Sequence, residues 1–405
     1  MKTMINRKRL INHIEELSQI GRTENGGINR FSFTDEEKKA NKLVEDYMKE
    51  AGLSVHYDAI GNLIGSVEGT EDLPAILLGS HIDTVPDGGK YDGPVGVLSA
   101  IEVMHTLKDQ GIKPKHPVKV ISFRDEEGTR FGFGMIGSRA VAGTLTTEDL
   151  QREDQNGITI EQAMKDDGLE IDHLDTAQLE NIKAYLEIHI EQGKVLEFNH
   201  TGVGNVTGIA GPLWLKFHLE GLAEHAGATP MDQRHDALTA ASHIITEIEK
   251  IANQFQDAVA TVGKVAVKPN GVNVIPGEVE FTADIRSIDE SERNSIEQKI
   301  KDFAQNIAND RNVSLQISEL QRVEPVLCDE DIQKAIKESI HELEENVVSL
   351  PSGAGHDAMQ FKNNFPVGMI FVRSVNGISH NPKEYSLDED IEQAANVLYK
   401  TLNRL

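Results

Sequence analysis

The sequence has one cysteine, no long apolar run and many fewer basic than acidic residues. The single Cys328 excludes an intrachain disulfide, so the chain suits a reducing compartment. It lies in Glu-Pro-Val-Leu-Cys-Asp without an evident catalytic partner, and we interpret it as structural. No stretch approaches the roughly 18 apolar residues of a membrane span, and the charged N-terminal segment lacks the apolar core of a signal peptide. The expected location is therefore the cytoplasm.

Acidic residues dominate the charge. The chain has 40 Lys and Arg against 66 Asp and Glu, which gives a formal net charge of −26. Nucleic acid and anionic membranes both require a basic patch, so neither is an expected partner. A small anionic substrate is still compatible with this charge, because one local Arg outweighs the global field at contact distance.

The length of 405 residues predicts two domains, because a single hydrophobic core rarely grows that large. Strand-like and helix-like segments alternate from about residue 54 and again after Pro325, which is typical of a mostly parallel α/β sheet flanked by helices. Between them, after a glycine-rich passage interpreted as a hinge, the elements follow the split order βαββαβ of a ferredoxin-like fold. We expect a catalytic domain of residues 1–208 and 324–405, and an inserted α+β domain of residues 209–323.

Residues that can bind metals recur where predicted strands end. The apolar run Ala75–Leu78 predicts a buried strand that ends at Gly79, and Ala184–Ile188 predicts a strand that ends just before His189. In open parallel sheets, ligands bind outside the carboxyl ends of the strands. His and carboxylate side chains are the ligands that divalent first-row metals prefer. A lone histidine is more often structural, but the coincidence at several strand ends favours one shared site. The residues concerned are His81 with Asp92, Glu126 with Glu127, His189, and His380.

This set could hold two divalent ions, with one bridging carboxylate and an open position for water. The adjacent Glu126 and Glu127 cannot both point the same way along an extended chain. One would therefore be a ligand and the other a general base that moves a proton from water to the leaving nitrogen. By themselves, the two glutamates would be read as solvated acids on a loop; their place at a strand end reverses that reading.

Five motifs follow one another along the chain: GSHIDTV (79–85), GGKYDG (88–93), EEGTRF (126–131), EIHIEQG (187–193) and GAGHDA (353–358). They resemble the hydantoinase/carbamoylase branch of the M20 metallopeptidase-like family. That branch holds N-carbamoyl-L-amino acid hydrolases, allantoate amidohydrolases and metal-type β-ureidopropionases. The resemblance covers essentially the whole chain.

The resemblance implies two divalent metal ions per subunit, expected to be Zn²⁺, with Mn²⁺, Co²⁺ or Ni²⁺ as alternatives. It also implies Glu126 as the general base and Asp83 as the support that orients the imidazole of His81. The implied ligands are His81 and His189 on one ion, Glu127 and His380 on the other, and Asp92 as the bridge.

For the inserted domain, the resemblance implies a lid that also forms a homodimer. His225, which alone would be an ordinary loop histidine, would reach the partner subunit's active site and stabilise the oxyanion. Arg286, otherwise a surface charge, would pair with a substrate carboxylate, because its planar guanidinium can donate two parallel hydrogen bonds to one. Further candidates for substrate contact are Asn273, Gln192, Gly355 and His356.

We therefore predict an amidohydrolase that cleaves a non-peptide C–N bond of a ureido or carbamoyl carboxylate with metal-activated water and Glu126 as base. No residue decides between N-carbamoyl-L-amino acids, ureidopropionate and allantoate as substrate. The alternative enzyme is a dipeptidase or aminoacylase of the same superfamily, which usually offers Asp at the position of His189. A binding protein without catalysis is disfavoured by the intact ligand set.

Overall fold

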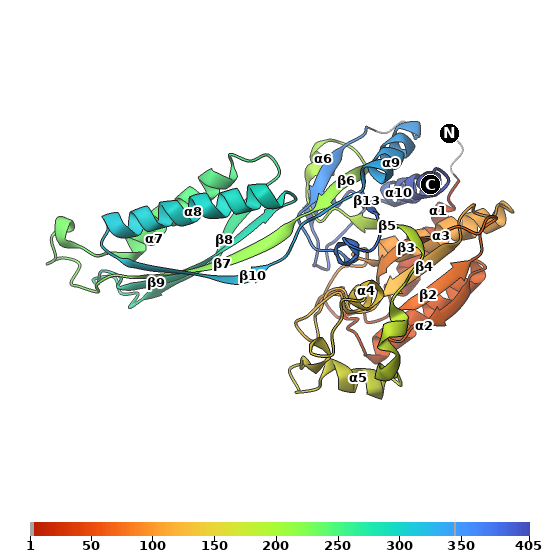
Figure 1. The fold of residues 1–405 in the computed structure, drawn as a ribbon, viewed down its shortest axis with the longest axis horizontal. Coiled ribbons are helices and arrows are strands. Elements are labelled where there is room, and N and C mark those ends of the chain that lie inside the picture. Colours follow the sequence, from red (N-terminus) through yellow and green to blue (C-terminus); the bar gives the residue numbers. More distant parts are fainter. Residues whose placement is uncertain (1–3, 344–345) are drawn as a thin grey trace. The chain divides into compact units, whose positions relative to one another are not determined.

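The computed structural model describes residues 4–343 and 346–405, so residues 1–3 and 344–345 of the expected catalytic domain lie outside the described part. The chain divides into two compact units (Figure 1). The first comprises residues 1–207, 327–352 and 356–405, and the second comprises 208–326 with Gly353–Gly355. Among the described helices, none combines the length and apolarity that crossing a membrane requires.

The first unit is built on a nine-stranded mixed sheet of order β1-β2-β4-β3-β5-β13-β6-β11, with β12 paired to β6. Its central strands run parallel, so their carboxyl ends meet at one edge of the sheet. These are β4 (Val118–Phe123), β3 (Ala75–His81), β5 (Ile182–Ile190) and β13 (Val367–Val372). The flanking strands are β1 (Ser54–Tyr57), β2 (Leu63–Val67), β6 (Val203–Ile209), β11 (Val326–Leu327) and β12 (Ser349–Ser352).

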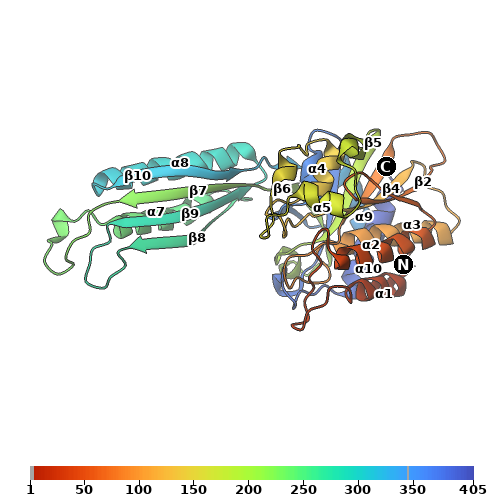
Figure 2. The same cartoon turned by 90° about the horizontal axis from the view of Figure 1, so that it is seen from below.

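Helices cover this sheet and share a continuous apolar core with its central strands. Figure 2 shows α1, α2, α3 and α10 layered together. The long helices are α1 (Arg7–Leu17), α2 (Asp35–Glu50), α3 (Pro94–Asp109), α9 (Glu330–Glu342) and α10 (Asp388–Leu402). The short ones are α4 (Ile136–Ala142), α5 (Ile160–Asp166) and α6 (Val195–Phe198), with 3-10 turns η1 (Asp149–Gln151), η2 (Ile171–Ala177), η4 (Asp357–Phe361) and η5 (Val375–Gly377).

Two of the expected strand ends were wrong. We expected β3 to end at Leu78, but it continues through Gly79 to His81, which pairs with Phe123 of β4. Gly79 does not stop the strand; it allows close pairing, because a Cβ there would lie 2.0 Å from the backbone oxygen of Ile121. Likewise, His189 lies within β5 and not after it. Regular strand pairing therefore fixes the backbone of both histidines.

The second unit follows the order β7 (Gly211–Glu220), η3 (Met231–Gln233), α7 (Ala237–Ala252), β8 (Val259–Lys268), β9 (Glu278–Ser287), α8 (Glu290–Asp310) and β10 (Ser314–Arg322). Its sheet has the order β10-β7-β9-β8 and is antiparallel throughout. Alternate residues of β7 and β9 are buried and pack with α7 and α8, including the stacked pair Phe217 and Phe281. The opposite face of this sheet is therefore left to polar or ligand-binding side chains.

Candidate active site

The predicted metal ligands meet at the carboxyl edge of the parallel strands. Each comes from a different segment, so the fold and not the sequence spacing brings them together. Two sets of three residues have potential ligand atoms within 4.8 Å of one another, and both contain Asp92. The sets are His81, Asp92 and His189, and Asp92, Glu127 and His380.

Asp92 lies at the centre of this arrangement. Its Oδ1 is 3.1 Å from Nε2 of His189 and 3.8 Å from Nε2 of His81. Its Oδ2 is 3.3 Å from Nε2 of His380, which is itself 3.6 Å from Oε1 of Glu127. Oδ1 of Asp92 thus faces His81 and His189, and Oδ2 faces His380, as a bridging carboxylate would require.

The site concentrates buried charge. Burial alone would lower the pKa of His81, but the carboxylates of Glu126 and Asp83 raise it well above its usual value. Burial and the charge of Asp92 raise the pKa of Glu127 to about 7. Burial would raise the pKa of Asp92, but His189 and His380 hold it well below its usual range. Several carboxyl groups lie close to one another and to the imidazoles, and divalent cations would neutralise the negative charge of these carboxylates.

The donor geometry fits divalent metal ions. Nε2 of His81 is buried and has no hydrogen-bond partner among the described residues. Its other ring nitrogen, Nδ1, lies 3.2 Å from the backbone oxygen and 3.3 Å from Oδ1 of Asp83. In His189, Nδ1 lies 3.0 Å from the backbone oxygen of Ile190. In both rings, a hydrogen bond at Nδ1 would leave Nε2 available as a ligand atom, the usual arrangement for metal-binding histidines.

Asp83 also fixes the two adjacent glutamates. Its Oδ1 accepts a hydrogen bond from the backbone N–H of Glu126 and its Oδ2 accepts one from Glu127, both at 3.1 Å. Glu126 belongs to neither set of three, and its Oε2 lies 3.7 Å from Nε2 of His81. Burial raises the pKa of Glu126 well above its usual value, and the charge of Glu127 adds to this. Glu126 is therefore a largely enclosed carboxyl, with a side chain 9% exposed, beside the candidate metal position.

The remaining candidates of the first unit lie close to these ligands. Nε2 of Gln192 donates to Oδ2 of Asp92 at 2.7 Å. His356 is buried, with Nε2 2.7 Å from Oγ of Ser352 and its ring centroid 4.5 Å from that of His189. The backbone of both Gln192 and His380 has a positive φ, at 58° and 54°. Such strained residues persist where the surrounding structure holds them, often at functional sites.

Glu187 is a further buried acid of this region that sequence reasoning missed. Its Oε1 accepts a hydrogen bond from Oγ of Ser80 at 2.8 Å. It forms a third compact group with His189 and His356. The sequence contained a signal for Glu187, because it lies two residues before the predicted ligand His189. Alternate residues of a strand share one face, so the two side chains were expected to point the same way.

Glu384 is also a missed residue and lies directly behind Asp92. Its Oε1 accepts hydrogen bonds from the backbone N–H of Tyr91 at 2.9 Å and of Asp92 at 3.1 Å. Its Oε2 accepts from Oγ of Ser379, whose hydroxyl is also 2.8 Å from Oδ2 of Asp92. A Cβ on Gly89 would lie 2.1 Å from Oε1 of Glu384, which explains the glycine at that position. Glu384 thus fixes the loop that carries Asp92.

Replacing Glu384 should therefore weaken metal binding. We expect Glu384→Ala to lower metal affinity by about 10- to 100-fold, as loss of a ligand's supporting hydrogen bonds commonly does. Glu384→Gln keeps the oxygen that accepts from Tyr91 and Asp92, so its loss should be smaller. Competition with a chelator measures the affinity, and thermal unfolding of the metal-free variants controls for stability. Wild-type affinity in Glu384→Ala would contradict this role.

Four candidates belong to the second unit: His225, Asn273, Arg286 and Gly355. His225 is exposed, and its Nδ1 accepts hydrogen bonds from the backbone N–H of Gly227 and Ala228, both at 3.1 Å. Its neutral ring therefore carries the proton on Nε2, which is available as a donor. Asn273 lies in the neighbouring loop, where its backbone oxygen accepts from Ala226.

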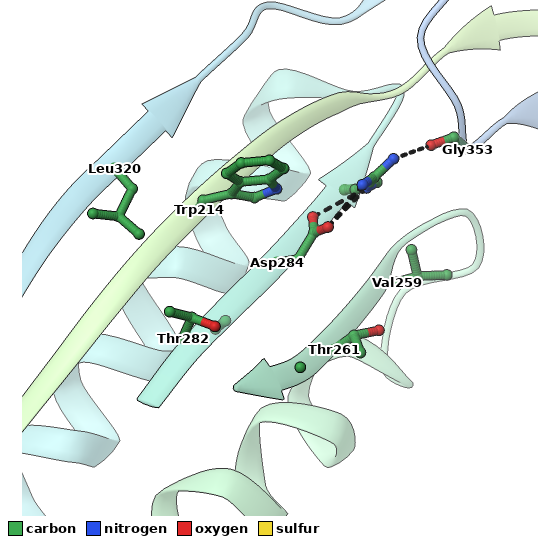
Figure 3. Close-up of a pocket in the computed structure, with 10 residues that line it drawn as sticks. Trp214, Val259, Thr261, Thr282, Asp284, Leu320 and Gly353 are labelled. Atoms are coloured by element: carbon green, nitrogen blue, oxygen red, sulfur yellow. Dashed lines mark hydrogen bonds and ion pairs between the residues drawn. The ribbon is translucent and has the colours of Figure 1, made fainter. Parts of the chain in front are cut away.

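Arg286 lies near the carboxyl end of β9 and lines a cavity (Figure 3). Its Nε and Nη2 donate to the carboxylate of Asp284, at 3.0 and 2.7 Å. Its Nη1 donates to the backbone oxygen of Gly353 at 2.6 Å, in the same segment as Gly355. Among the described residues, these bonds engage three of the five N–H groups of the guanidinium, which leaves one on each terminal nitrogen.

Known proteins resemble the chain over its whole length. The family model described as peptidase family M20/M25/M40 matches residues 77–404. An N-carbamoyl-L-amino acid amidohydrolase of Geobacillus stearothermophilus is 48% identical over 405 residues, with 99% of each chain covered. An allantoate amidohydrolase of Bacillus subtilis is 36% identical over 399 residues, covering 98% of this chain and 97% of that one.

A solved structure supports the same assignment. The crystal structure of an amidase of the hydantoinase/carbamoylase family from Burkholderia multivorans is 36% identical and superposes with a TM-score of 0.94, covering 99% of this chain and 98% of that one. Both the sequence and the fold therefore agree with the expected family. The chain belongs to peptidase family M20/M25/M40 and, within it, to the hydantoinase/carbamoylase group of amidohydrolases.

Proposed function

We propose that this chain removes the carbamoyl group of N-carbamoyl-L-amino acids, releasing the free amino acid, ammonia and carbon dioxide. The observation that carries the proposal is the pair of ligand sets that share Asp92, in a chain 48% identical to a relative named for this activity. Allantoate is the second candidate, because the Bacillus subtilis relative is named for that substrate.

Two divalent ions, Zn²⁺ in the first instance, would occupy the two sets. His81 and His189 would hold one and Glu127 and His380 the other, with Asp92 between them. When bound, such ions polarise the scissile carbonyl and lower the pKa of a coordinated water. Burial and neighbouring carboxylates raise the pKa of Glu126 and of Glu127. This supports the assignment, because divalent ions would supply the positive charge that keeps such acids ionised.

Glu126 would act as the general base. It would accept a proton from the attacking water and return it to the leaving nitrogen when the C–N bond breaks. Asp83 would hold it in position through the backbone N–H of Glu126. Because burial raises the pKa of Glu126, the carboxyl group could retain the proton between the two transfers.

Arg286 would anchor the substrate carboxylate with its two remaining N–H groups. His225 would donate Nε2–H to the oxygen that becomes negative, and Asn273 would assist from the neighbouring loop. Within the second unit, however, these groups lie at opposite ends of one strand. Glu278 begins β9 beside the loops of His225 and Asn273, and Arg286 lies eight residues further on, about 27 Å along the strand.

A single substrate cannot bridge that length. In an N-carbamoyl amino acid, only one carbon and one nitrogen separate the carboxylate from the ureido carbon. We therefore infer that His225 and Asn273 serve the active site of a second copy in a homodimer, and that residues 209–323 act as the lid and dimerisation domain. This arrangement requires two chains to complete one site.

A substrate panel tests the proposed function. We expect the metal-loaded protein to release ammonia and free amino acid from N-carbamoyl-L-amino acids, and chelation to abolish the reaction. The panel includes allantoate, ureidopropionate and dipeptides, with the metal-free protein as control. Activity on dipeptides alone would exclude the proposal and favour the dipeptidase or aminoacylase alternative.

A further inference from the structure

We propose that the cavity on the open face of the second unit's sheet receives the substrate's side chain and selects large apolar ones. The inference rests on the proposed function, and it specifies which N-carbamoyl-L-amino acids the site takes. The cavity has a volume of about 530 Å³, within the range of small-molecule sites. Arg286, the proposed carboxylate anchor, is one of its lining residues.

Large apolar side chains are exposed in this cavity. Trp214, Val259 and Leu320 line it and are 39%, 57% and 53% exposed. Figure 3 shows Trp214 beside Leu320 and across from Val259, with the ion pair of Asp284 between them. Clustered exposed apolar groups of this kind mark binding sites on soluble proteins.

Farther from Arg286, the same sheet face carries ion pairs. Further along β7, β8 and β9, Lys216 lies 3.6 Å from Glu280, and Lys268 lies 2.9 Å from Glu278. These ion pairs are the usual covering of a solvated sheet face. The apolar patch therefore lies at the Arg286 end of this face, and the ion pairs lie further along it.

Two β-bulges shape the cavity. The bulge of β10 between Glu319 and Gln321 falls at Leu320, which lines the cavity beside Trp214. The bulge of β8 between Thr261 and Lys264 places Gly263 in the lining. A Cβ on Gly263 would meet no atom within 4 Å, so the missing side chain leaves the space open. Both irregularities enlarge or line the same cavity.

The position of Arg286 connects this cavity to the substrate. In an N-carbamoyl-L-amino acid, the carboxylate, the ureido nitrogen and the side chain are attached to one carbon. Anchoring the carboxylate at Arg286 therefore places the side chain within a few bond lengths of the guanidinium. The cavity beginning at Arg286 is the apolar space that such a side chain can reach within the second unit.

Allantoate would place a second ureido group where the amino acid has its side chain. Thr261 and Thr282 offer hydroxyl groups to it, but the Asp284 carboxylate is already paired with Arg286, and Trp214, Val259 and Leu320 offer no hydrogen-bond acceptor. Burying a ureido group against them would leave polar atoms unpaired, which is costly. The cavity therefore favours an apolar side chain over allantoate.

The chain's single tryptophan is Trp214, so its fluorescence reports directly on this cavity. With Glu126→Gln to prevent turnover, N-carbamoyl-L-leucine should shift the emission to shorter wavelength, and N-carbamoylglycine should shift it much less. In the wild-type enzyme we expect kcat/KM for the leucine substrate to exceed that for the glycine substrate by at least about tenfold, the scale of apolar pocket contacts.

Variants identify the cavity as the cause. Trp214→Ala removes an apolar wall and Gly263→Leu fills the space, so each should reduce the leucine-to-glycine ratio of kcat/KM by about tenfold. Val265→Thr is the matched control and should keep the wild-type ratio. Val265 lies on β8, as Gly263 does, and it is 48% exposed but does not line the cavity. Activity on N-carbamoylglycine verifies that each variant is folded.

The outcomes separate the two proposals. Equal wild-type kcat/KM for the two substrates, or equal losses for both in the variants, would overturn the specificity pocket and leave the proposed function intact. A preference for allantoate that Trp214→Ala abolishes would assign the cavity to the ureido group instead and overturn the apolar selection. No turnover of any carbamoyl substrate by the metal-loaded enzyme would overturn the proposed function itself.

Discussion

The Glu126→Gln variant is expected to bind its metal ions normally and to lose kcat by a factor of about 10² to 10⁴. The amide keeps the size and most hydrogen bonds of the carboxylate, but it cannot accept a proton from water. Glu126 is held by its backbone N–H to Asp83, and it lies outside both candidate ligand sets. Its replacement should therefore affect the proton transfer and not the metal content. Steady-state kinetics and elemental analysis of the same preparation measure both.

The neighbouring Glu127 supplies the matched control. It belongs to the set with Asp92 and His380, so Glu127→Gln should lower metal content or metal affinity before it affects the proton transfer. Two adjacent residues of the same type would then give opposite phenotypes. Wild-type turnover in Glu126→Gln with both metals bound would show that another group is the base.

Mixing two inactive variants should restore activity. His225→Ala removes the proposed oxyanion donor, which typically costs about 10² to 10³ in kcat, and Glu126→Gln removes the base. In a mixed dimer, one site receives an intact Glu126 from its own chain and an intact His225 from its partner. An equal mixture allowed to exchange subunits should recover about a quarter of wild-type activity, because about half of the dimers are mixed and each has one complete site.

Two controls make this result specific. The doubly substituted chain, His225→Ala with Glu126→Gln, should restore nothing when mixed with either single variant. Size-exclusion chromatography with light scattering tests whether the chain is a dimer at all. Mixed dimers without recovered activity would show that His225 acts within its own chain, or not at all, and would contradict the division of the site between two copies.

Much of the first unit follows from local sequence patterns. Runs such as Val118–Phe123 form strands that are mostly buried on both faces, and helices such as α2 begin where Thr34 caps the first turn. The positions of Glu126 and Glu127 after β4 follow in the same way, since a strand end and the next residues are neighbours along the chain. These are short-range relations that spacing alone can encode.

The glycines show where local reasoning fails. Gly79 was expected to end a strand, but it continues the strand because the neighbouring backbone of Ile121 leaves no room for a side chain. The glycine-rich passage interpreted as a hinge contains β6 (Val203–Ile209), which pairs with β13 and β12. In both cases, strand partners far away in the sequence decide the conformation.

By itself, the sequence determined the chemistry of this protein: which imidazoles and carboxylates are present, which lie near strand ends, and which family their motifs resemble. Only the tertiary structure decided that Glu384 fixes the loop of Asp92, and that Trp214, Leu320 and Arg286 share one cavity. The physical reason is that hydrogen bonds and packing act over a few ångströms in space. Residues separated by almost 300 positions, such as Asp92 and Glu384, become neighbours only when strands pair.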